Sequence, residues 1–520
     1  MQIETKFRIS SPLVVALLLA ATMPVTALAQ VRSHASSAIN ALYGSVSTTK
    51  PVAADLPLSL DDAIHRGLQH NLQLAITGQD RRTAAGVRLQ AINALLPTIT
   101  WDAVRSRQQI DLAALGFRSN VLHSFPPGFV PPSALTSFQP VVTVNLVQAQ
   151  ANLNQSLFDL RAFELYRAAR QEIRAIDYSD QGARQDVIQV VAGTYLLVLA
   201  DEANVTNAQS LLATNTEILR QASLSHQAGV STKLDELRAE VQYQQQDQLV
   251  IARQNQLEKD EIALKREIGL PADQVIHLTD KAPYADFDAM PLDQARRVAY
   301  AHRQDYLQMQ ARLRSAQFQS RAARFERLPT LSFGGNYGVT GTVGGLYHGT
   351  FLAQGTLSVP LFREAKFRGD RDVADARTRQ TLSQMAALKN QIDAELRDDM
   401  LDIAATQQLV QVARSNVDLS QSSLSDSTER YKNGIADNLE VVQAQAVLSA
   451  AQAQMVNSLY QFNQAKLSLA RNMGMLDAQY RTILGTSAPA PAGPVTTSSL
   501  RDFGMSPSPV PNRPGTPADQ

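Results

Sequence analysis

The side chains that most often carry out chemistry are sparse in this chain. Its 520 residues include no cysteine, which rules out disulfides, a thiol nucleophile and cysteine-based metal sites. The eight histidines are scattered and no two of them stand four residues apart, so we expect no metal ion. No G-x-S-x-G sequence marks a nucleophile elbow. We therefore predict that the protein is not an enzyme and has no catalytic residues and no cofactor.

Two further groups of residues resemble sites but favour structural roles. A cluster of glycines is not followed by a helix with a P-loop lysine, so it indicates a hairpin of close-packed strands rather than a phosphate-binding loop. A cluster of carboxylates among arginines favours solvated or ion-paired helix surface. The glycines are Gly334, Gly335, Gly338, Gly341, Gly344 and Gly345, and the carboxylates are Glu395, Asp398, Asp399 and Asp402. The net charge of zero gives no support for nucleic acid as a partner.

Two acidic residues occupy equivalent positions after two glycines. Asp235 lies six residues after Gly229, and Glu440 lies six residues after Gly434. Each carboxylate also stands three residues after a residue that can cap a helix, which is the spacing of a capping box. The two capping candidates are Thr232 and Asp437. If several copies of the chain meet around a pore, the same carboxylates would instead form a ring that attracts cations. The two interpretations are compatible.

The two glycines and their acidic residues occupy equivalent positions because the chain is internally duplicated. Residues 58–101 and 291–333 align with an offset of 232, which places His302 on His70 and Pro329 on Pro97. In both copies the apolar period changes from about 3.6 to 2 at a Leu-Pro pair, as expected where a helix passes into a strand. Pro97 and Pro329 mark these helix-to-strand junctions, because proline can neither continue a helix nor donate to a strand ladder. A period near 200 residues indicates a duplicated half-domain.

Each copy contains two strand-like segments with one apolar and one polar face. They begin at Pro97, at Val141, after Pro329 and near Thr350, and residues 105–140 form a long loop between the first two. The second segment changes phase near Val147, which predicts a β-bulge there. Long alternating strands are typical of a lipid-facing barrel with a wet lumen. Four strands are too few to close such a barrel, so closure requires several chains.

Each copy then continues with a very long helix. Residues 159–227 and 363–432 are helical over close to 70 residues, which corresponds to roughly 100 Å. Each is followed by a glycine-containing turn and a returning helix with an apolar residue every seven positions. These residues are Tyr243, Val250, Leu257 and Leu264 in the first copy, and Val441, Leu448, Met455, Phe462 and Leu469 in the second. A sustained seven-residue period indicates coiled-coil packing.

The sequence as a whole divides into six parts. Residues 1–29 combine Lys6 and Arg8, an apolar run and Ala27-Leu28-Ala29, which is typical of a cleaved signal peptide; without a cysteine, the exported chain is not a lipoprotein. Residues 30–57 are an extended N-terminal segment. The first structural repeat is 58–270, the linker is 271–290, and the second repeat is 291–476. Residues 477–520 are a Pro/Ser-rich tail, which we expect to be disordered from about 487.

Residues 58 to 476 resemble the TolC family of outer-membrane efflux and secretion channels. The resemblance rests on the duplicated helix starts LSLDDAI and PLDQARR, the Leu-Pro junctions, QSLFD and VPLFR at strand exits, and the turns HQAGVSTKLDELRAE and RYKNGIADNLEVVQAQ. It implies a mainly α fold with a membrane β-barrel portion. Each chain would give four strands to a shared trimeric β-barrel, and long coiled-coil helices to a periplasmic α-barrel.

The resemblance also implies a function and partners. The protein would be a passive homotrimeric channel in the outer membrane of a Gram-negative-type bacterium, serving a tripartite efflux pump or a type I secretion system. Its barrel would contact outer-membrane lipid. The turns at Gly229 and Gly434 would dock on a periplasmic adaptor (membrane fusion) protein, which connects to an inner-membrane transporter.

In the family, acidic residues line the tip, and the aspartate that matches Asp235 pairs with a tyrosine that matches Tyr431. Glu440 matches the second acidic position. An arginine of the family's latch is Ala436 here, which is a departure from the pattern. The alternative function is a periplasmic coiled-coil scaffold or tether without a pore. Aromatic residues suited to a membrane interface favour the channel. They are Trp101, Phe333, Tyr337, Tyr347 and Phe351.

Overall fold

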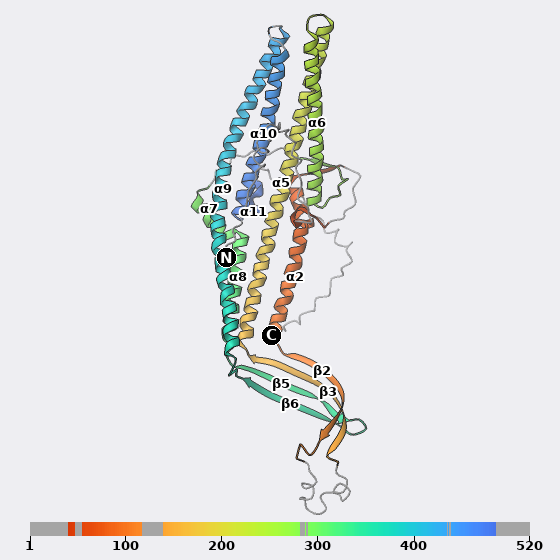
Figure 1. Ribbon diagram of the computed structural model, residues 1–520, viewed down its shortest axis with the longest axis vertical. Helices are drawn as coiled ribbons and strands as arrows, with labels where there is room; N and C mark the ends of the chain where they lie inside the picture. Colours follow the sequence, from red (N-terminus) through yellow and green to blue (C-terminus); the bar gives the residue numbers. More distant parts are fainter. Residues whose placement is uncertain are drawn as a thin grey trace, which may run out of the picture.

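The computed structural model describes residues 40–46, 55–116, 139–280, 287, 290–433, 435 and 438–484. The molecule is long and narrow, with a four-stranded sheet at one end and two helical hairpins that reach to the other (Figure 1). Over the described ranges, no helix is both long enough and apolar enough to cross a membrane. The signal peptide and the tail from 487 fall outside these ranges, and so does most of the predicted 105–140 loop. The start of that loop was predicted wrongly, because residues 105–111 continue the strand that begins at Thr98.

The order of the elements confirms the predicted duplication. Both copies run from a pair of short helices through two strands to a long helix and a returning helix. The first copy consists of α1 (Leu60–His70), α2 (Leu72–Asn93), β2 (Thr98–Asp111), β3 (Val141–Phe158), α5 (Leu160–Gln227) and α6 (Lys233–Glu267). The second consists of α7 (Leu292–His302), α8 (Gln304–Phe325), β5 (Thr330–Thr342), β6 (Tyr347–Ser358), α9 (Glu364–Lys432) and α10 (Asn438–Asn472).

The helical stretch before each Leu-Pro pair is broken in two, at Asn71 and at Arg303. Both residues have extended backbones (ψ 134° and 119°), and both are buried. They occupy the same repeat position, 232 residues apart. Asn71 caps the second helix by accepting from the Gln73 N–H at 2.8 Å, and it donates to the Leu42 carbonyl of the short 3-10 turn η1 (Ala41–Tyr43) at 2.7 Å. The Asn71 side chain thus satisfies backbone groups on both sides of its break, whereas Arg303 makes no side-chain cap at the second break.

The sheet is antiparallel with the order β2-β3-β5-β6. The β2–β3 register runs without a shift from Thr98 opposite Asn154 to Asp111 opposite Val141, so the bulge predicted near Val147 is wrong. A shift occurs instead near Ser156, where β3 meets β5. The change of phase in the sequence therefore means that the apolar residues pass from one face of a regular strand to the other.

The glycine cluster lies in the β5–β6 hairpin, as predicted. A Cβ atom at Gly338 would lie 2.1 Å from the Ala149 carbonyl oxygen of the neighbouring strand, so the close strand approach requires glycine there. The turn of the hairpin uses Gly344 at φ +82°. These glycines serve strand packing and the turn.

The two long helices contain 68 and 69 residues, or about 100 Å each. The returning helix α6 packs on α5, and α10 packs on both α9 and α5. The seven-residue series of α10 is confirmed as its packing face, because Val441, Leu448, Phe462 and Leu469 are buried. In the α6 series, Val250 and Leu264 are buried, and Tyr243 and Leu257 are half-buried. Gly229 lies in the turn between α5 and α6 and has φ +72°, a conformation that residues with an L side chain rarely adopt.

The main core lies midway along the molecule, where α1, α5, α10 and a small parallel sheet meet. That sheet pairs β1 (Leu56–Leu58) with β4 (Ile276–Leu278), so the end of the predicted N-terminal segment and a short part of the predicted linker are strands. Asp280, just after β4, accepts from the Leu60 N–H at 2.7 Å and from the Tyr195 hydroxyl at 2.8 Å. The linker thus caps the first helix of the first repeat.

The tail that was predicted from residue 477 begins with regular structure. Residues Leu476–Leu484 form a helix, α11, whose Leu476, Ile483 and Leu484 are buried in the main core. Tyr480 donates to the Asp61 carboxylate at 2.6 Å, and Arg481 pairs with the same carboxylate at 2.9 Å. Burial and the Asp61 carboxylate together raise the pKa of Tyr480 to about 12. The first part of the predicted tail therefore belongs to the folded body.

Candidate functional site

The sheet has one face that is unusual for a protein in water. The register places Trp101, Ala151, Tyr337 and Phe351 in one row across the four strands, all pointing to the same side. The three aromatic residues are 69%, 72% and 79% exposed. A contiguous apolar face of this kind needs an apolar environment.

The opposite face of the same strands is polar. Asn152 donates to Asp102 at 2.7 Å, and Gln150 donates to the Thr340 hydroxyl at 3.3 Å. On β3 this face carries amide side chains from Gln148 toward the helices, as expected for a surface in contact with water. At the far end of the strand the same face carries Leu146, Val144 and Val142. Pro97 and Pro329 stand immediately before β2 and β5, so these two strands follow the helices α2 and α8 of the body, while β3 and β6 lead into α5 and α9. The sheet therefore combines an apolar side and a wet side at the end of the helical body.

At the other end of the molecule, the α5–α6 hairpin forms one half of the tip. Thr232 and Asp235 make the capping box that their spacing predicted. The Asp235 backbone N–H donates to the Thr232 hydroxyl at 3.3 Å, and the Thr232 N–H donates to the Asp235 carboxylate at 3.2 Å. Asp235 also lies 3.7 Å from Arg238. The carboxylate thus has a structural role whatever else it does.

The α9–α10 hairpin forms the other half of the tip. Glu440 pairs with Arg430 at 3.4 Å, a contact between two half-exposed side chains. Tyr431 packs against the cluster of Leu424, Val441, Ala444 and Leu448. Burial, and then the Asp235 carboxylate, raise the pKa of Tyr431, so the tyrosine of one hairpin lies within electrostatic reach of the aspartate of the other. Gly434, Ala436 and Asp437 lie outside the described residues.

An apolar groove lies between the two halves of the tip. It has a volume of about 410 Å³ and separates the first turns of α6 from those of α10. Its apolar lining residues are Leu234, Leu237, Val241, Leu439 and Val442. Nearby, Val230 is 81% exposed and Ile435 is 70% exposed. The sequence did not predict this groove, because its two walls come from helices about 200 residues apart.

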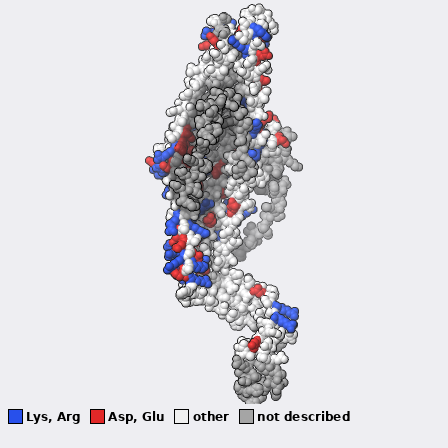
Figure 2. All heavy atoms as spheres, in the orientation of Figure 1, with Lys and Arg blue, Asp and Glu red and all other residues white. Residues whose placement is uncertain are grey.

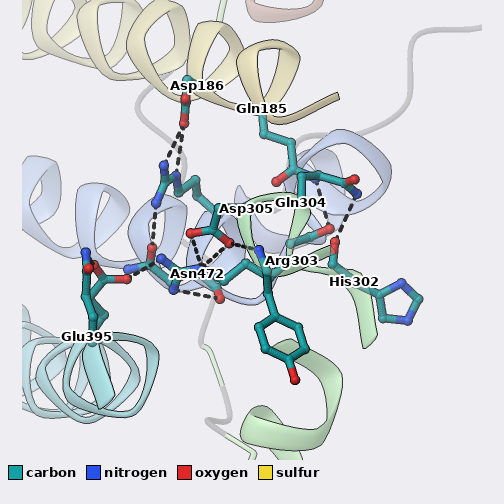
Figure 3. A network of polar contacts seen from close by, with 12 residues as sticks. Gln185, Asp186, His302, Arg303, Gln304, Asp305, Glu395 and Asn472 are labelled. Carbon is teal, nitrogen blue, oxygen red and sulfur yellow. Dashed lines mark hydrogen bonds and ion pairs between the residues drawn. The ribbon is translucent and has the colours of Figure 1, made fainter. Parts of the chain in front are cut away.

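A buried polar network joins four helices at the level of the α7–α8 break (Figure 3). The Arg303 side chain is almost fully buried, and it pairs with Asp305 at 3.0 Å and with Glu395 of α9 at 2.5 Å. Its guanidinium also approaches the Asn472 carbonyl of α10 at 3.5 Å. Beside it, Arg471 of α10 pairs with Asp186 of α5 at 2.9 Å. The network fixes α5, α8, α9 and α10 relative to one another.

This network corrects part of the prediction for the carboxylate cluster. Asp399, expected on solvated surface, is buried and accepts from Ser468 at 2.6 Å and from Asn472 at 2.7 Å. Burial raises the pKa of Asp399. Glu395 is paired as expected, but with a buried arginine. The sequence missed this arrangement because the partners lie on different helices, 73 residues apart for Asp399 and Asn472.

The described residues include no group of three or more metal-ligating side chains. What they do form is a sheet with an apolar and a wet face, carried on a tall body of coiled-coil hairpins. This combination defines a subunit of an outer-membrane export channel. The sequence profile described as "Outer membrane efflux protein" matches residues 63–270 and 295–475, and the chain belongs to this family.

Curated relatives agree with this assignment. The chain is 25% identical over 342 residues to the toluene efflux pump outer membrane protein TtgF of Pseudomonas putida, covering 63% of this chain and 70% of that protein. It is 23% identical over 448 residues to the alkaline protease secretion protein AprF of Pseudomonas aeruginosa, covering 81% and 85%.

Solved structures show the same fold. The outer membrane protein VceC of Vibrio cholerae superposes with a TM-score of 0.66 at 17% identity, covering 80% of this chain and 96% of that chain. The CmeC outer membrane channel of Campylobacter jejuni superposes with a TM-score of 0.66 at 17% identity, covering 84% and 92%. The predicted family, fold class and outer-membrane location are therefore confirmed, and the protein is an export duct with a periplasmic extension.

Proposed function

We propose that three copies of the chain assemble into one passive channel. The observation that carries this proposal is the sheet itself: β2 and β6 are its two edges, and its aromatic face is exposed. Unpaired strand edges are not tolerated in lipid, because their N–H and C=O groups have no water to bond. Pairing β6 of one copy with β2 of the next closes the sheet, and three copies supply twelve strands.

The tip is the proposed docking site for the periplasmic partners. A periplasmic adaptor would bind at the turns around Gly229 and Gly434 and cover the apolar groove between α6 and α10. An inner-membrane transporter would supply the cargo and the energy. The relatives' names refer to toluene efflux, pyoverdine export and alkaline protease secretion. Since similar channels serve such different cargo, we assign its selection to the partner pump.

The tip carboxylates are the proposed gate. In a trimer, Asp235 and Glu440 each contribute three negative charges around the narrow end, and Tyr431 lies within reach of the Asp235 charge. Asp235→Asn retains an oxygen that can accept from Thr232. Glu440→Gln removes the charge of an exposed ion pair with Arg430, worth about 0–1 kcal/mol, and keeps an oxygen that can accept a hydrogen bond. The double variant should therefore keep its stability and lose cation preference in planar-bilayer recordings. Wild-type selectivity in that variant would place the gate elsewhere.

Fractionation and heat-modifiable migration test the channel itself. The trimer should remain in the outer-membrane fraction and dissociate on SDS-PAGE only after boiling. The alternative, a periplasmic scaffold or tether whose strands form a soluble sheet, predicts a chain in the soluble periplasm. That result would contradict the channel.

A further inference from the structure

The charged residues of the sheet are confined to one strand. In the described strands, Lys, Arg, Asp and Glu occur only on β2, as Asp102, Arg105, Arg107 and Asp111. Side chains alternate along a strand, so Arg105 and Arg107 share the face of Trp101, while Asp102 lies on the opposite, polar face. Figure 2 shows the resulting basic patch on the sheet, away from the charged cluster on the helices.

The position of the arginines along the strand matches the edge of a membrane. From Pro97 the side chains on this face are Ile99, Trp101 and Ala103, and the first charge is Arg105. Eight residues of antiparallel strand span roughly 27 Å, or about 21 Å along the membrane normal for strands tilted by about 40°. The apolar band of such barrels is about 25 Å tall. Arg105 and Arg107 therefore lie at its outer boundary, at the end of the sheet away from the helices.

No protein carboxylate is available to these arginines in the described strands. Across the sheet, Arg105 stands opposite Val147 and Arg107 opposite Asn145. β6, the strand that would pair with the free edge of β2 in a trimer, contains no acidic residue. Asp111 accepts from the backbone N–H of Ala113 at 2.9 Å and so caps its own turn. Residues 112–140 likewise contain no Asp or Glu in the sequence.

We infer that Arg105 and Arg107 bind the phosphate groups of phosphorylated lipids in the outer leaflet. The inference rests on the proposed trimeric channel with its aromatic face toward lipid. Two guanidinium groups on one face, two residues apart, can each bind a phosphate in bidentate fashion. Trp101 lies on the same face four residues nearer the helices, roughly 10 Å deeper in the apolar band, where it faces the acyl chains of a bound lipid. The lipid contact thus fixes the height of the barrel in the membrane.

The single tryptophan of the chain, Trp101, provides the readout. The purified trimer is reconstituted in phosphatidylcholine with brominated acyl chains, which quench a lipid-exposed tryptophan. Non-brominated diphosphoryl lipid A is then titrated in, and its displacement of brominated lipid from the Trp101 face relieves the quenching. This relief measures the binding of lipid A relative to phosphatidylcholine.

Wild type should prefer diphosphoryl lipid A, and Arg105→Gln with Arg107→Gln should lower that preference by about fivefold per arginine. This corresponds to about 1 kcal/mol for each basic side chain near an anionic surface. Arg105→Lys with Arg107→Lys should retain part of the preference, and high salt should reduce it in the wild type. Asp102→Asn, a charge change on the opposite face of the same strand, is the matched control and should leave it unchanged.

The outcomes separate this inference from the proposed channel. If brominated lipid does not quench Trp101, the aromatic face does not point to lipid, and both the phosphate site and the proposed channel are overturned. If quenching is normal but the Gln double variant keeps the wild-type preference, or the wild type shows none, only the phosphate site is overturned. A similar loss in Asp102→Asn would also overturn it, because the effect would then not depend on the outward face.

Discussion

A charge placed at the middle of the apolar face should prevent assembly, while the same charge on the polar face should not. Ala353 lies on the aromatic face of β6, midway between Leu357 and Gly349, and opposite Gly335. It is therefore near the bilayer midplane, where an arginine costs roughly 2–4 kcal/mol, or about 30- to 1,000-fold in the folding equilibrium. Gln354, the next residue, points to the opposite face, so Gln354→Arg should cost little.

Depth provides a second comparison on the same face. Leu357 lies four residues closer to the helices, near the inner edge of the apolar band, where the cost of an arginine falls to about 0–1 kcal/mol. The expected order of destabilisation is thus Ala353→Arg, then Leu357→Arg, then Gln354→Arg. Each variant is folded from urea into phosphatidylcholine vesicles at one fixed protein concentration, because trimer stability depends on concentration. Trp101 emission and unboiled SDS-PAGE report folding and trimer yield.

Two results would refute this reasoning. Equal losses for Ala353→Arg and Gln354→Arg would mean that the two faces are not lipid and water. A larger loss for Leu357→Arg than for Ala353→Arg would mean that the apolar band is centred elsewhere on the strand.

Three further predictions concern the helical body. Glu395→Gln with Asp305→Asn should destabilise the protein by about 3 kcal/mol in denaturant titrations, because it leaves the buried Arg303 charge without a carboxylate. Arg303→Met should destabilise the protein less than this double variant, because the two carboxylates that it leaves unpaired are partly exposed to water. A larger loss of stability for Arg303→Met would contradict this account. A chain that ends just after α11 should form trimers like the full chain, whereas one that ends just before α11 should give a low trimer yield on unboiled gels. Burial raises the pKa of Glu267 to about 8, so the stability that its protonation contributes is fully present below the unfolded pKa of about 4 and is lost as the pH rises through 8. Glu267→Gln should therefore raise the thermal midpoint, relative to wild type, more at pH 9 than at pH 4, and an equal shift at both would count against it.

The sequence determined the features that are encoded locally. The change of period at Pro97 and Pro329 located two of the four strands, because helices and strands impose different periods on their apolar residues. The seven-residue series located the coiled-coil faces for the same reason. Thr232 and Asp235 formed their predicted cap because both partners lie within one helical turn. Duplication then extended each local pattern to the second half of the chain.

Only the tertiary structure decided how distant segments meet. The β1–β4 pair joins Leu58 to Leu278, and Asp280 caps a helix that begins 220 residues earlier. The buried charge of Arg303 is compensated by Glu395 on another helix, and the tip groove needs both hairpins. Pairings of this kind leave no periodic pattern in the sequence. Each residue type is compatible with many surfaces, and the choice among them is made by the packing of the whole body and the burial of polar groups that must find partners.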